Sequence, residues 1–321
     1  MKCLYCGRSI KETSSVEEKE NCWHSRCTKS FFGTRTLPVL DISESQLVEI
    51  ANAAVSQGLT VPGVQKKLSL HLSGDEDSRL TIVDYPTGYI LKPQTEDFNS
   101  LPEFEDLAMR LAEIAGIQTV PHALINLNGK YAYITRRIDR DIKKDVVNLY
   151  AMEDFCQLSN RLTQDKYRGS YENCGKIIKR YSSRPGMDLS ELFLRLVFSF
   201  IIGNSDMHLK NFSLRETEPA NRNYALSKAY DLLPVNIIMP EDDEQLALTM
   251  NGKKRNIHRK DFIKFAENCD IAEKTANAML KKLCSLRDDF LKQCDQSYLS
   301  DEIILKVKDL IMQRIGMLVL T

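Results

Sequence analysis

The chain is 321 residues long with 43% apolar and 27% charged residues, the proportions of an ordinary globular protein large enough for two lobes. Lysine and arginine together number 44, as do aspartate and glutamate, so the overall charge excludes a general attraction to nucleic acid. No apolar run approaches the roughly 20 residues of a membrane span, and the first residues lack a secretory signal, so we expect a cytoplasmic protein without membrane contact.

Residues 1–35 form a short, polar, cysteine-rich segment. Its candidate zinc ligands are Cys3, Cys6, His24 and Cys27. The first two and the last two are each separated by two residues, which is a usable spacing for a tetrahedral Zn²⁺ site, and Cys22 is an alternative ligand. The other interpretation is a reduced, metal-free extension, because an odd total of nine cysteines argues against a disulfide framework. Neither interpretation predicts DNA binding by this segment.

The stretch from Thr60 to Lys67 precedes the first predicted strand. It contains a single glycine, so it is neither a Walker A loop nor a G-x-G-x-x-G loop. Two interpretations stay open. It is either an ordinary turn with exposed lysines or a loop that folds over phosphates through backbone N–H groups and a lysine side chain.

Residues 36–140 alternate short strands with one helix. Alternating apolar residues predict strands at 68–72, 80–83, 89–92, 123–127 and 130–134. Pro86-Thr87-Gly88 predicts a hairpin between the second and third of these strands, and Asn128-Gly129 predicts one between the last two. A helix with one apolar face follows Ser100. We therefore predict an α+β, two-lobed, protein-kinase-like fold, with a β-rich N-lobe over 36–140 and a mostly helical C-lobe over 141–321.

Two charged residues take natural roles in this plan. Lys92 ends a strand, where a kinase places the lysine that contacts the phosphates of ATP. Glu105 lies in the first turn of the next helix, where it could pair with that lysine, and Glu103 is a competitor better suited to the helix start. For Lys92 alone, a solvated lysine at a strand end is the alternative, and the loop described next favours the kinase role.

Residues 203–212 carry the most specific signal. They follow an apolar run, 192–202, which predicts a buried helix as a rigid base for a polar loop. Asp206 and Asn211 have the spacing of the protein-kinase catalytic loop, and Asp231 comes after a predicted strand-turn-strand. Kinases need one aspartate beside the acceptor hydroxyl, and an asparagine and a second aspartate on Mg²⁺. We interpret the chain as an ATP-dependent phosphotransferase, with an ordinary polar turn as the alternative.

Together these residues resemble the HipA family of bacterial Ser/Thr kinases, the toxins of type II toxin–antitoxin systems. The matching segments, in family order, are Pro62–Lys67, Tyr89–Pro93, Leu101–Glu105, Arg137–Arg140, Asn204–Phe212 and Tyr230-Asp231. The resemblance runs from about residue 55 to the C-terminus. Full-length HipA carries an additional N-terminal subdomain, and the shorter chain here resembles HipT, the kinase of three-part systems in which the small protein HipS replaces that subdomain.

The resemblance implies a role for each matching residue. Asp206 would be the catalytic base, with Lys92 and Glu105 completing the catalytic set, while Asn211 and Asp231 would bind Mg²⁺. The implied ATP-binding residues are Pro62, Gly63, Val64, Gln65, Lys66, Lys67, Lys92, Arg136, Arg137, Ile138, His208, Asn211, Tyr230 and Asp231.

Within that set, residues 63–67 would form the phosphate-binding loop and residues 136–138 would offer backbone groups to the adenine. Thr60 would occupy the place of an autophosphorylated serine. HipT-like proteins carry serine at the positions of both Thr60 and Pro62, so at most one hydroxyl remains here for this modification. Phe104 stands where many relatives have asparagine, which alters a local polar contact but not the expected pairing of lysine and glutamate.

We therefore expect a Ser/Thr protein kinase that uses ATP and Mg²⁺ and acts as a toxin, with Zn²⁺ as a structural ion if the cysteines bind it. By resemblance, its protein substrate would be translation-linked, such as an aminoacyl-tRNA synthetase. Its partners would be a HipB-like helix-turn-helix antitoxin, through which alone it would reach DNA, and a HipS-like small protein. The alternatives are a small-molecule or lipid phosphotransferase, and a kinase-shaped module that binds ATP or an antitoxin without catalysis.

Overall fold

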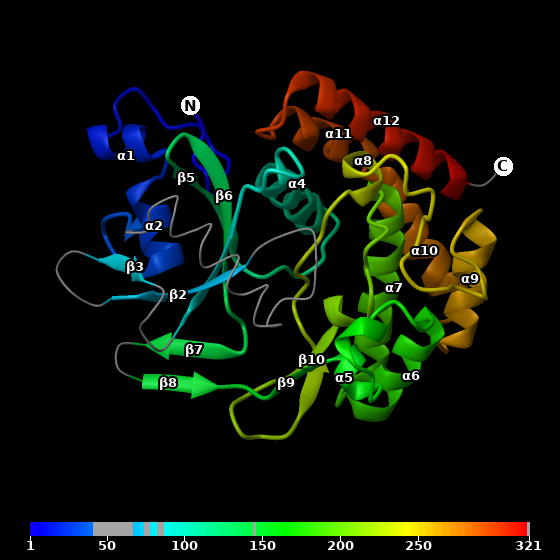
Figure 1. The fold of residues 1–321 in the computed structure, drawn as a ribbon. Coiled ribbons are helices and arrows are strands. Elements are labelled where there is room, and N and C mark those ends of the chain that lie inside the picture. The colour runs from blue at the N-terminus through cyan, green and yellow to red at the C-terminus, as the bar shows by residue number, and fades with distance from the viewer. Residues whose placement is uncertain (41–66, 74–77, 82–86, 144–145, 320–321) are drawn as a thin grey trace. The chain divides into compact units, whose positions relative to one another are not determined.

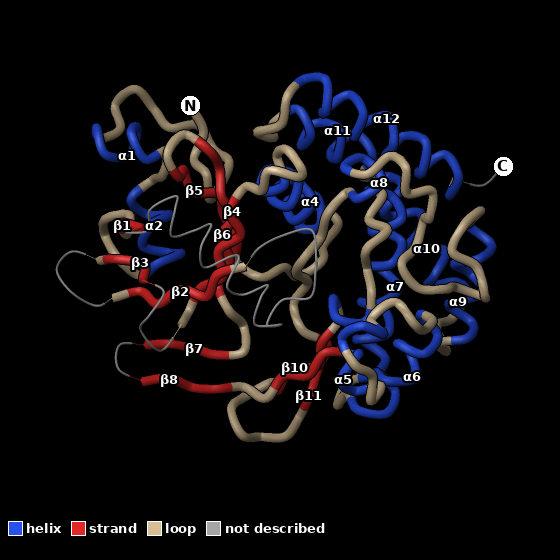
Figure 2. Tube along the Cα trace, viewed as in Figure 1, coloured by secondary structure: helices blue, strands red, loops and turns tan. Residues whose placement is uncertain are grey.

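The structure, a computed structural model, describes residues 1–40, 67–73, 78–81, 87–143 and 146–319 (Figure 1). The chain divides into two compact units, the first formed by residues 1–106 with 120–148 and the second by residues 107–119 with 149–321. The cysteine-rich segment therefore belongs to the first unit. Strands are concentrated in the first unit and helices in the second (Figure 2), which is the predicted α+β composition.

The first unit is built on a six-stranded sheet with the order β1-β3-β2-β4-β6-β5. Its strands are β1 (Val39–Leu40), β2 (Leu68–Leu72), β3 (Arg79–Thr81), β4 (Tyr89–Pro93), β5 (His122–Leu127) and β6 (Lys130–Arg136). Neighbouring strands are antiparallel except for β1 and β3, which are parallel. Leu70 and Leu91, in the middle of the sheet, are fully buried.

The hairpin predicted between residues 80–83 and 89–92 is wrong. β2 lies between β3 and β4 and pairs with both, with His71 opposite Thr81 and Leu68 opposite Leu91. A turn signal indicates where a strand ends, but not with which strand it pairs. The apolar face of β2 is buried beside β4, and burial of one face fixes strand register more strongly than a local turn preference does.

The hairpin predicted at Asn128-Gly129 is confirmed. β5 and β6 pair antiparallel with Leu127 opposite Lys130, and the two turn residues have φ angles of 51° and 85°. Two-residue hairpin turns of this kind need left-handed backbone at both central positions, which asparagine and glycine adopt most readily. Strand β5 lies at one edge of the described sheet.

Two helices follow the first pair of cysteines: α1 (Val16–Asn21) and α2 (Ser25–Phe32). Phe31 and Phe32 of α2 contact Tyr89 of β4, with ring centroids 5.8 and 5.3 Å apart. Trp23 stacks on Tyr5 and meets Phe31 edge-on. The apolar surface of this segment is thus an aromatic cluster that it shares with the sheet.

Helix α4 (Leu101–Ile114) lies between β4 and β5 in the chain, as predicted. The helices that follow in the second unit are α5 (Phe155–Leu158), α6 (Tyr171–Tyr181), α7 (Pro185–Ile202), α8 (Val235–Ile238), α9 (Arg259–Asn268), α10 (Glu273–Ser285), α11 (Arg287–Asp295) and α12 (Asp301–Leu318). Among the described residues, no helix is both long and apolar enough to cross a bilayer.

Helix α7 is the buried helix that the apolar run predicted. From Arg195 to Ile202 each of its residues is buried. A helix buried on all sides is held by contacts on every face, so it provides a rigid base for the loop after it.

Five further strands follow the main sheet: β7 (Arg140–Lys143), β8 (Val146–Leu149), β9 (Met152–Asp154), β10 (Ser213–Glu216) and β11 (Tyr224–Leu226). The antiparallel pair β10–β11 was predicted, with Leu214 opposite Leu226. The pair β7–β8 and the addition of β9 to β10 were not. These three strands are short and only partly buried, so their sequences lack a clear apolar alternation.

Candidate functional site

The loop predicted to be catalytic starts at Gly203, directly after α7. Gly203 has a φ of 72°, and a Cβ atom at this position would collide with Cδ2 of Leu310 on α12. Only glycine satisfies both conditions without strain. The carbonyl of Gly203 accepts a hydrogen bond from the Asn236 N–H (3.0 Å), and Nδ2 of Asn236 donates to Oγ of Ser205 (3.3 Å). The start of the loop is therefore fixed from two sides.

Asp206 is the aspartate of this loop. Its N–H donates to Oδ1 of Asn204 (3.2 Å), and its carbonyl accepts from Nδ2 of Asn211 (2.8 Å). The side chain is 39% exposed, with Nε2 of His208 4.0 Å from Oδ2. The Tyr167 hydroxyl donates to Oδ1 at 2.5 Å. A carboxylate held in place by its backbone yet open to solvent suits a base that receives a proton from an incoming hydroxyl.

Asn211 and Asp231 are the predicted metal ligands. The amide nitrogen of Asn211 donates to the Asp206 carbonyl, so the amide oxygen is the atom that could bind a metal. Asp231 has a φ of 60°, a left-handed conformation uncommon outside glycine and often found at functional sites. It follows Tyr230, whose hydroxyl donates to the Lys210 carbonyl (3.0 Å) beside Asn211. An amide oxygen and a carboxylate are a donor set that suits Mg²⁺.

Two further contacts connect this loop and Tyr230 to the three-stranded sheet β11-β10-β9 of the second unit. Burial raises the pKa of Tyr230, so its hydroxyl stays protonated, and Oγ of Ser213 on β10 lies 2.5 Å from it. Nζ of Lys210 pairs with Oδ2 of Asp154 at the end of β9 (2.6 Å). The loop is thus bound to β9 and β10 as well as to α7.

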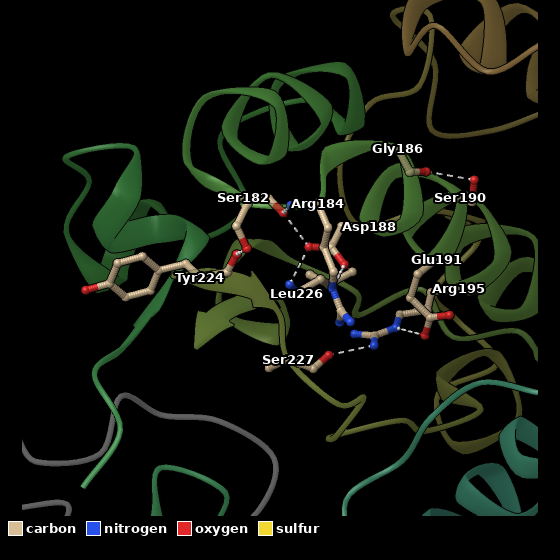
Figure 3. A network of polar contacts seen from close by, with 11 residues as sticks. Ser182, Arg184, Gly186, Asp188, Ser190, Glu191, Arg195, Tyr224, Leu226 and Ser227 are labelled. Carbon is tan, nitrogen blue, oxygen red and sulfur yellow. Dashed lines mark hydrogen bonds and ion pairs between the residues drawn. The ribbon is translucent and has the colours of Figure 1, made fainter. Parts of the chain in front are cut away.

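A polar network joins α7 to the strand that leads to Asp231 (Figure 3). The Asp188 carboxylate accepts from the N–H of Leu226 on β11 (2.7 Å), and Nη2 of Arg195 donates to the Ser227 carbonyl (2.6 Å). Asp188 and Arg195 are each 2% exposed. Because both contacts end on β11 or the residue after it, α7 sets the course of the chain towards Asp231. These two residues were not identified from the sequence, since neither lies in a motif.

The first unit contains the predicted lysine–glutamate pair. Nζ of Lys92, on β4, lies 2.5 Å from Oε1 of Glu105, on α4. The two residues are 4% and 0% exposed, and the ammonium also lies over the ring of Tyr133, 5.3 Å from its centroid. A buried ion pair is expensive to desolvate and contributes little net stability, so its presence is better explained by a function for the charge.

The expected adenine-binding stretch, Arg136 to Ile138, begins at the end of β6. The N–H groups of Arg136 and Arg137 donate to the carbonyls of Pro121 (3.0 Å) and Gly88 (2.9 Å). These two donors are engaged within the first unit. An adenine contact at 136–138 would therefore use other backbone groups of the stretch.

Asp139 organises the chain just after that stretch. It accepts hydrogen bonds from Arg137 (2.7 Å, Nη2) and Arg140 (2.7 Å, Nη2). Burial alone would raise the pKa of Asp139, but the hydrogen bonds from the two guanidinium groups outweigh it and hold the pKa well below its ordinary value. The carboxylate therefore stays charged and keeps both arginines in place.

The remaining predicted phosphate-loop residues, Pro62 to Lys66, and Thr60 lie outside the described residues. Lys67 is described and exposed, immediately before β2. Its role stays a prediction.

The predicted zinc ligands come together in the first unit. They are Cys3, Cys6, His24 and Cys27. Each offers one ligand atom, and these four atoms all lie within 4.8 Å of one another. The alternative, Cys22, is not part of this group, and its thiol donates instead to the carbonyl of Lys19 (3.7 Å). The four side chains could hold a zinc ion.

Sequence reasoning missed Tyr167, which touches Asp206. Its ring meets the ring of His208 edge-on, with centroids 5.0 Å apart. Burial, with the neighbouring Asp206 carboxylate, raises the pKa of Tyr167, so the phenol remains a hydrogen-bond donor. Tyr167 precedes Asp206 by 39 positions and belongs to no motif, so only the fold reveals the contact.

The mixed α+β architecture, with a strand-rich unit and a helical unit, is a kinase-like fold. Residues 59–289 match the HipA-like C-terminal domain family, and the chain belongs to this family.

Two solved structures share the fold. The HipA toxin–antitoxin complex of Shewanella oneidensis MR-1, with HipB and operator DNA, gives a TM-score of 0.69 at 18% identity, over 81% of this chain and 65% of that chain. The proinflammatory kinase CtkA of Helicobacter pylori gives a TM-score of 0.53 at 14% identity, over 78% of this chain and 94% of that chain. At these identities the likeness concerns the fold.

Three curated relatives carry the word kinase in their names. A Haemophilus influenzae protein is 24% identical over 270 residues, which is 77% of this chain and 76% of its own length. Sinorhizobium fredii Y4dM is 31% identical over 248 residues, 72% of this chain and 58% of its own length. Sinorhizobium fredii Y4mE is 30% identical over 201 residues, 61% of this chain and 46% of its own length. The chain thus spans about half of the length of the two Sinorhizobium relatives.

Proposed function

We propose that this chain is an ATP- and Mg²⁺-dependent Ser/Thr protein kinase and the toxin of a type II toxin–antitoxin system. The observation that carries the proposal is the constrained loop in which Asn211 is hydrogen-bonded to Asp206, together with the left-handed Asp231 after β11. Membership of the HipA-like family supports the toxin context.

In the proposed reaction, the acceptor hydroxyl attacks the γ-phosphorus of ATP in line, its proton passes to Asp206, and the bond to the leaving ADP breaks. Asn211 and Asp231 would hold Mg²⁺, which would supply positive charge to the phosphates. Lys92 neutralises phosphate charge, and Glu105 keeps that lysine in position. Positioning and fixed electrostatics account for most of the rate enhancement in such a site.

The remaining nucleotide contacts are proposed from the family pattern. Residues 62–67 would cover the phosphates with backbone N–H groups and lysines. Residues 136–138 would contact the adenine, while His208 and Tyr230 would lie near the nucleotide. His208 is buried directly beside Asp206, which supports its part in this set.

The substrate and partners follow from the same proposal. The acceptor would be a serine or threonine of a translation-linked protein such as an aminoacyl-tRNA synthetase. A HipB-like helix-turn-helix protein would neutralise the kinase and connect it to DNA, and a HipT-type arrangement would add a HipS-like small protein. Co-purification of the tagged chain with the products of adjoining genes tests these partners directly.

Incubation with γ-labelled ATP, Mg²⁺ and cell extract tests the activity. We expect label in a protein band, with Asp206→Asn and Asp231→Asn each reducing transfer by at least about 100-fold, because they remove the base and a metal ligand. Asp270→Asn is the matched control, since the Asp270 side chain is 79% exposed and pairs with Lys179 on α6 (2.5 Å). Melting temperatures should stay within error for all three variants. Near-normal transfer by Asp206→Asn would contradict the site assignment.

The same experiment separates the alternative functions. Label recovered in a lipid extract or a small molecule, with none in protein, would identify another kind of phosphotransferase. Saturable ATP binding without any labelled product would identify a non-catalytic binding module. Label that appears in a protein with the wild type and is lost with Asp206→Asn would identify the chain as a protein kinase.

We also propose that Thr60 is autophosphorylated and that this modification restrains activity. A phosphate adds about −1.5 to −2 charge and three acceptor oxygens, which beside Lys66 and Lys67 would bind those cations or repel the phosphates of ATP. We expect intact-mass analysis after incubation with Mg·ATP to show one added phosphate, and Thr60→Val to lack it. Phosphate found only at other residues would contradict this assignment and leave the kinase function untouched.

A further inference from the structure

The four ligand side chains in the N-terminal segment have the geometry of a tetrahedral metal site. Nδ1 of His24 lies 3.4 Å from Sγ of Cys6 and 3.7 Å from Sγ of Cys27. Around a tetrahedral Zn²⁺ with ordinary bond lengths, sulfur and nitrogen ligands are about 3.6 Å apart. The two observed separations lie on either side of that value, and the Cys3 thiol completes the group.

The other ring nitrogen of His24 fixes its tautomer. Nε2 lies 3.3 Å from the carbonyl oxygen of Ser9. A carbonyl can only accept a hydrogen bond, so Nε2 carries the proton and the neutral ring presents its lone pair at Nδ1. A histidine that donates to a backbone carbonyl with one nitrogen and faces the ligand group with the other is the usual arrangement at zinc sites.

The first two cysteines lie on a tight turn. The N–H of Gly7 donates to the Cys3 carbonyl (2.8 Å), and Gly7 has a φ of 69°, which glycine adopts without strain. The N–H of His24 points at Sγ of Cys3 (3.5 Å). The turn and this contact thus hold Cys3 beside the second half of the ligand group.

The residues next to the ligands are joined to the edge of the large sheet. Leu4, after Cys3, accepts a hydrogen bond from the N–H of Leu124 on β5 (3.2 Å). Trp23, before His24, donates from Nε1 to the carbonyl of the same Leu124 (3.2 Å). Edge strands expose unpaired backbone groups, and here Leu124 uses both of its groups on the segment.

We propose that Cys3, Cys6, His24 and Cys27 bind one Zn²⁺, and that this ion fastens the N-terminal segment onto the β5 edge of the sheet. Binding of Zn²⁺ would release the three thiol protons, so that the three thiolates and the neutral imidazole are its ligands. The segment has little apolar core apart from the aromatic cluster it shares with the sheet, so the metal supplies the cross-link between its two halves. This role is independent of phosphoryl transfer.

Zinc content of the full chain, purified without added metal, tests the ligand set. We expect about one equivalent in the wild type and in Cys22→Ser, the matched control, and less than about a tenth of an equivalent in Cys27→Ser. Replacement of zinc by Co²⁺ should give the visible bands of a tetrahedral thiolate site in the same two proteins. Less than a tenth of an equivalent in the wild type, or loss of zinc in Cys22→Ser, would overturn the proposal.

The fluorescence of Trp23 tests the fastening role on unmodified protein, because it is the only tryptophan of the chain. We expect a chelator to shift its emission to longer wavelength and to lower the melting temperature, and added Zn²⁺ to reverse both changes. Unchanged emission and melting after complete removal of the metal would refute the fastening role. This measurement does not depend on whether Cys27→Ser folds.

Discussion

The Tyr167 hydroxyl occupies one oxygen of the Asp206 carboxylate, the group proposed to receive the proton of the acceptor hydroxyl. It donates to one carboxylate oxygen at 2.5 Å, and its raised pKa keeps it protonated through the physiological range. Hydrogen bonds to a carboxylate are stronger than those between neutral groups. Under the proposed function, an acceptor hydroxyl that uses Oδ1 would therefore have to displace this phenol.

Tyr167→Phe should thus strengthen binding of the acceptor protein, because it removes the competing hydroxyl. We expect the KM for the protein substrate to fall by roughly fivefold, equivalent to about 1 kcal/mol for the lost competing hydrogen bond. The KM for ATP should not change, because the substitution removes no nucleotide contact. Tyr181→Phe, at an exposed ring stacked on Arg180, is the control and should match the wild type. A fivefold rise in the KM for the protein would mean that the hydroxyl assists binding instead.

The sequence predicted the residues of the loop but not the groups that hold them. Asp206, Asn211 and Asp231 were predicted because metal and proton chemistry restrict both residue type and spacing, and their roles stay predictions. Asp188 could not, because its function depends on the Leu226 N–H, which becomes its neighbour only after folding. Spacing along the chain carries no information on such contacts.

At the scale of elements, the network between α7 and β11 makes a stability prediction. Asp188→Ala removes the carboxylate that accepts from the buried N–H of Leu226 and from Oγ of Ser182 (2.6 Å). Leaving buried donors unpaired should lower the free energy of unfolding by about 2 to 3 kcal/mol. Urea unfolding followed by circular dichroism measures this.

Asp295→Ala is the matched control for that variant. Asp295 is 58% exposed and pairs with Lys308 on the surface, so its loss should change the free energy of unfolding by less than about 0.5 kcal/mol. Equal losses for the two variants would show that the buried network adds nothing specific.

The strands show where local signals suffice. Asn128-Gly129 identified the β5–β6 hairpin, because both of its residues meet the backbone requirement of the turn itself. The turn signal at residues 86–88 did not identify the partner of β4. It predicted pairing with β3, but β2 lies between β3 and β4 in the sheet. Pairing between strands is decided by which apolar faces are buried together, and that is a property of the whole sheet.

At the scale of the molecule, each compact unit contributes different catalytic candidates. The buried pair of Lys92 and Glu105 belongs to the first unit, and the loop with Asp206 and Asn211 belongs to the second. The sequence has strand patterns in the early part of the chain and helical periodicity in the late part, and the structure has strands and helices in that order. The contacts of the N-terminal segment with β5 were not predictable, as they join positions about 100 residues apart.

The close approach of α12 to the loop leaves no room for a side chain at Gly203. Gly203→Ala forces a left-handed alanine against Leu310 and should cost about 3 kcal/mol of stability and much of the phosphoryl transfer. Gly316 lies on the exposed side of α12, with no atom within 4 Å of an added methyl group. Gly316→Ala should therefore raise the free energy of unfolding by up to about 1 kcal/mol. Thermal unfolding and labelled-phosphate transfer measure both effects. A Gly203→Ala protein as stable and active as the wild type would show that the loop tolerates displacement.

Leu310 lies near the C-terminal end of the chain, so the loop gains its contact with α12 only late in synthesis. Leu310 packs against Gly203, and Arg314 on the same helix donates to Oδ1 of Asn236 (3.1 Å), which in turn binds the loop. A ribosome releases the loop well before it releases α12, and nascent chains fold from the N-terminal end. During translation the loop therefore lacks its contact with Leu310 until α12 has docked, and we expect the proposed phosphoryl transfer to reach its full rate only after that step.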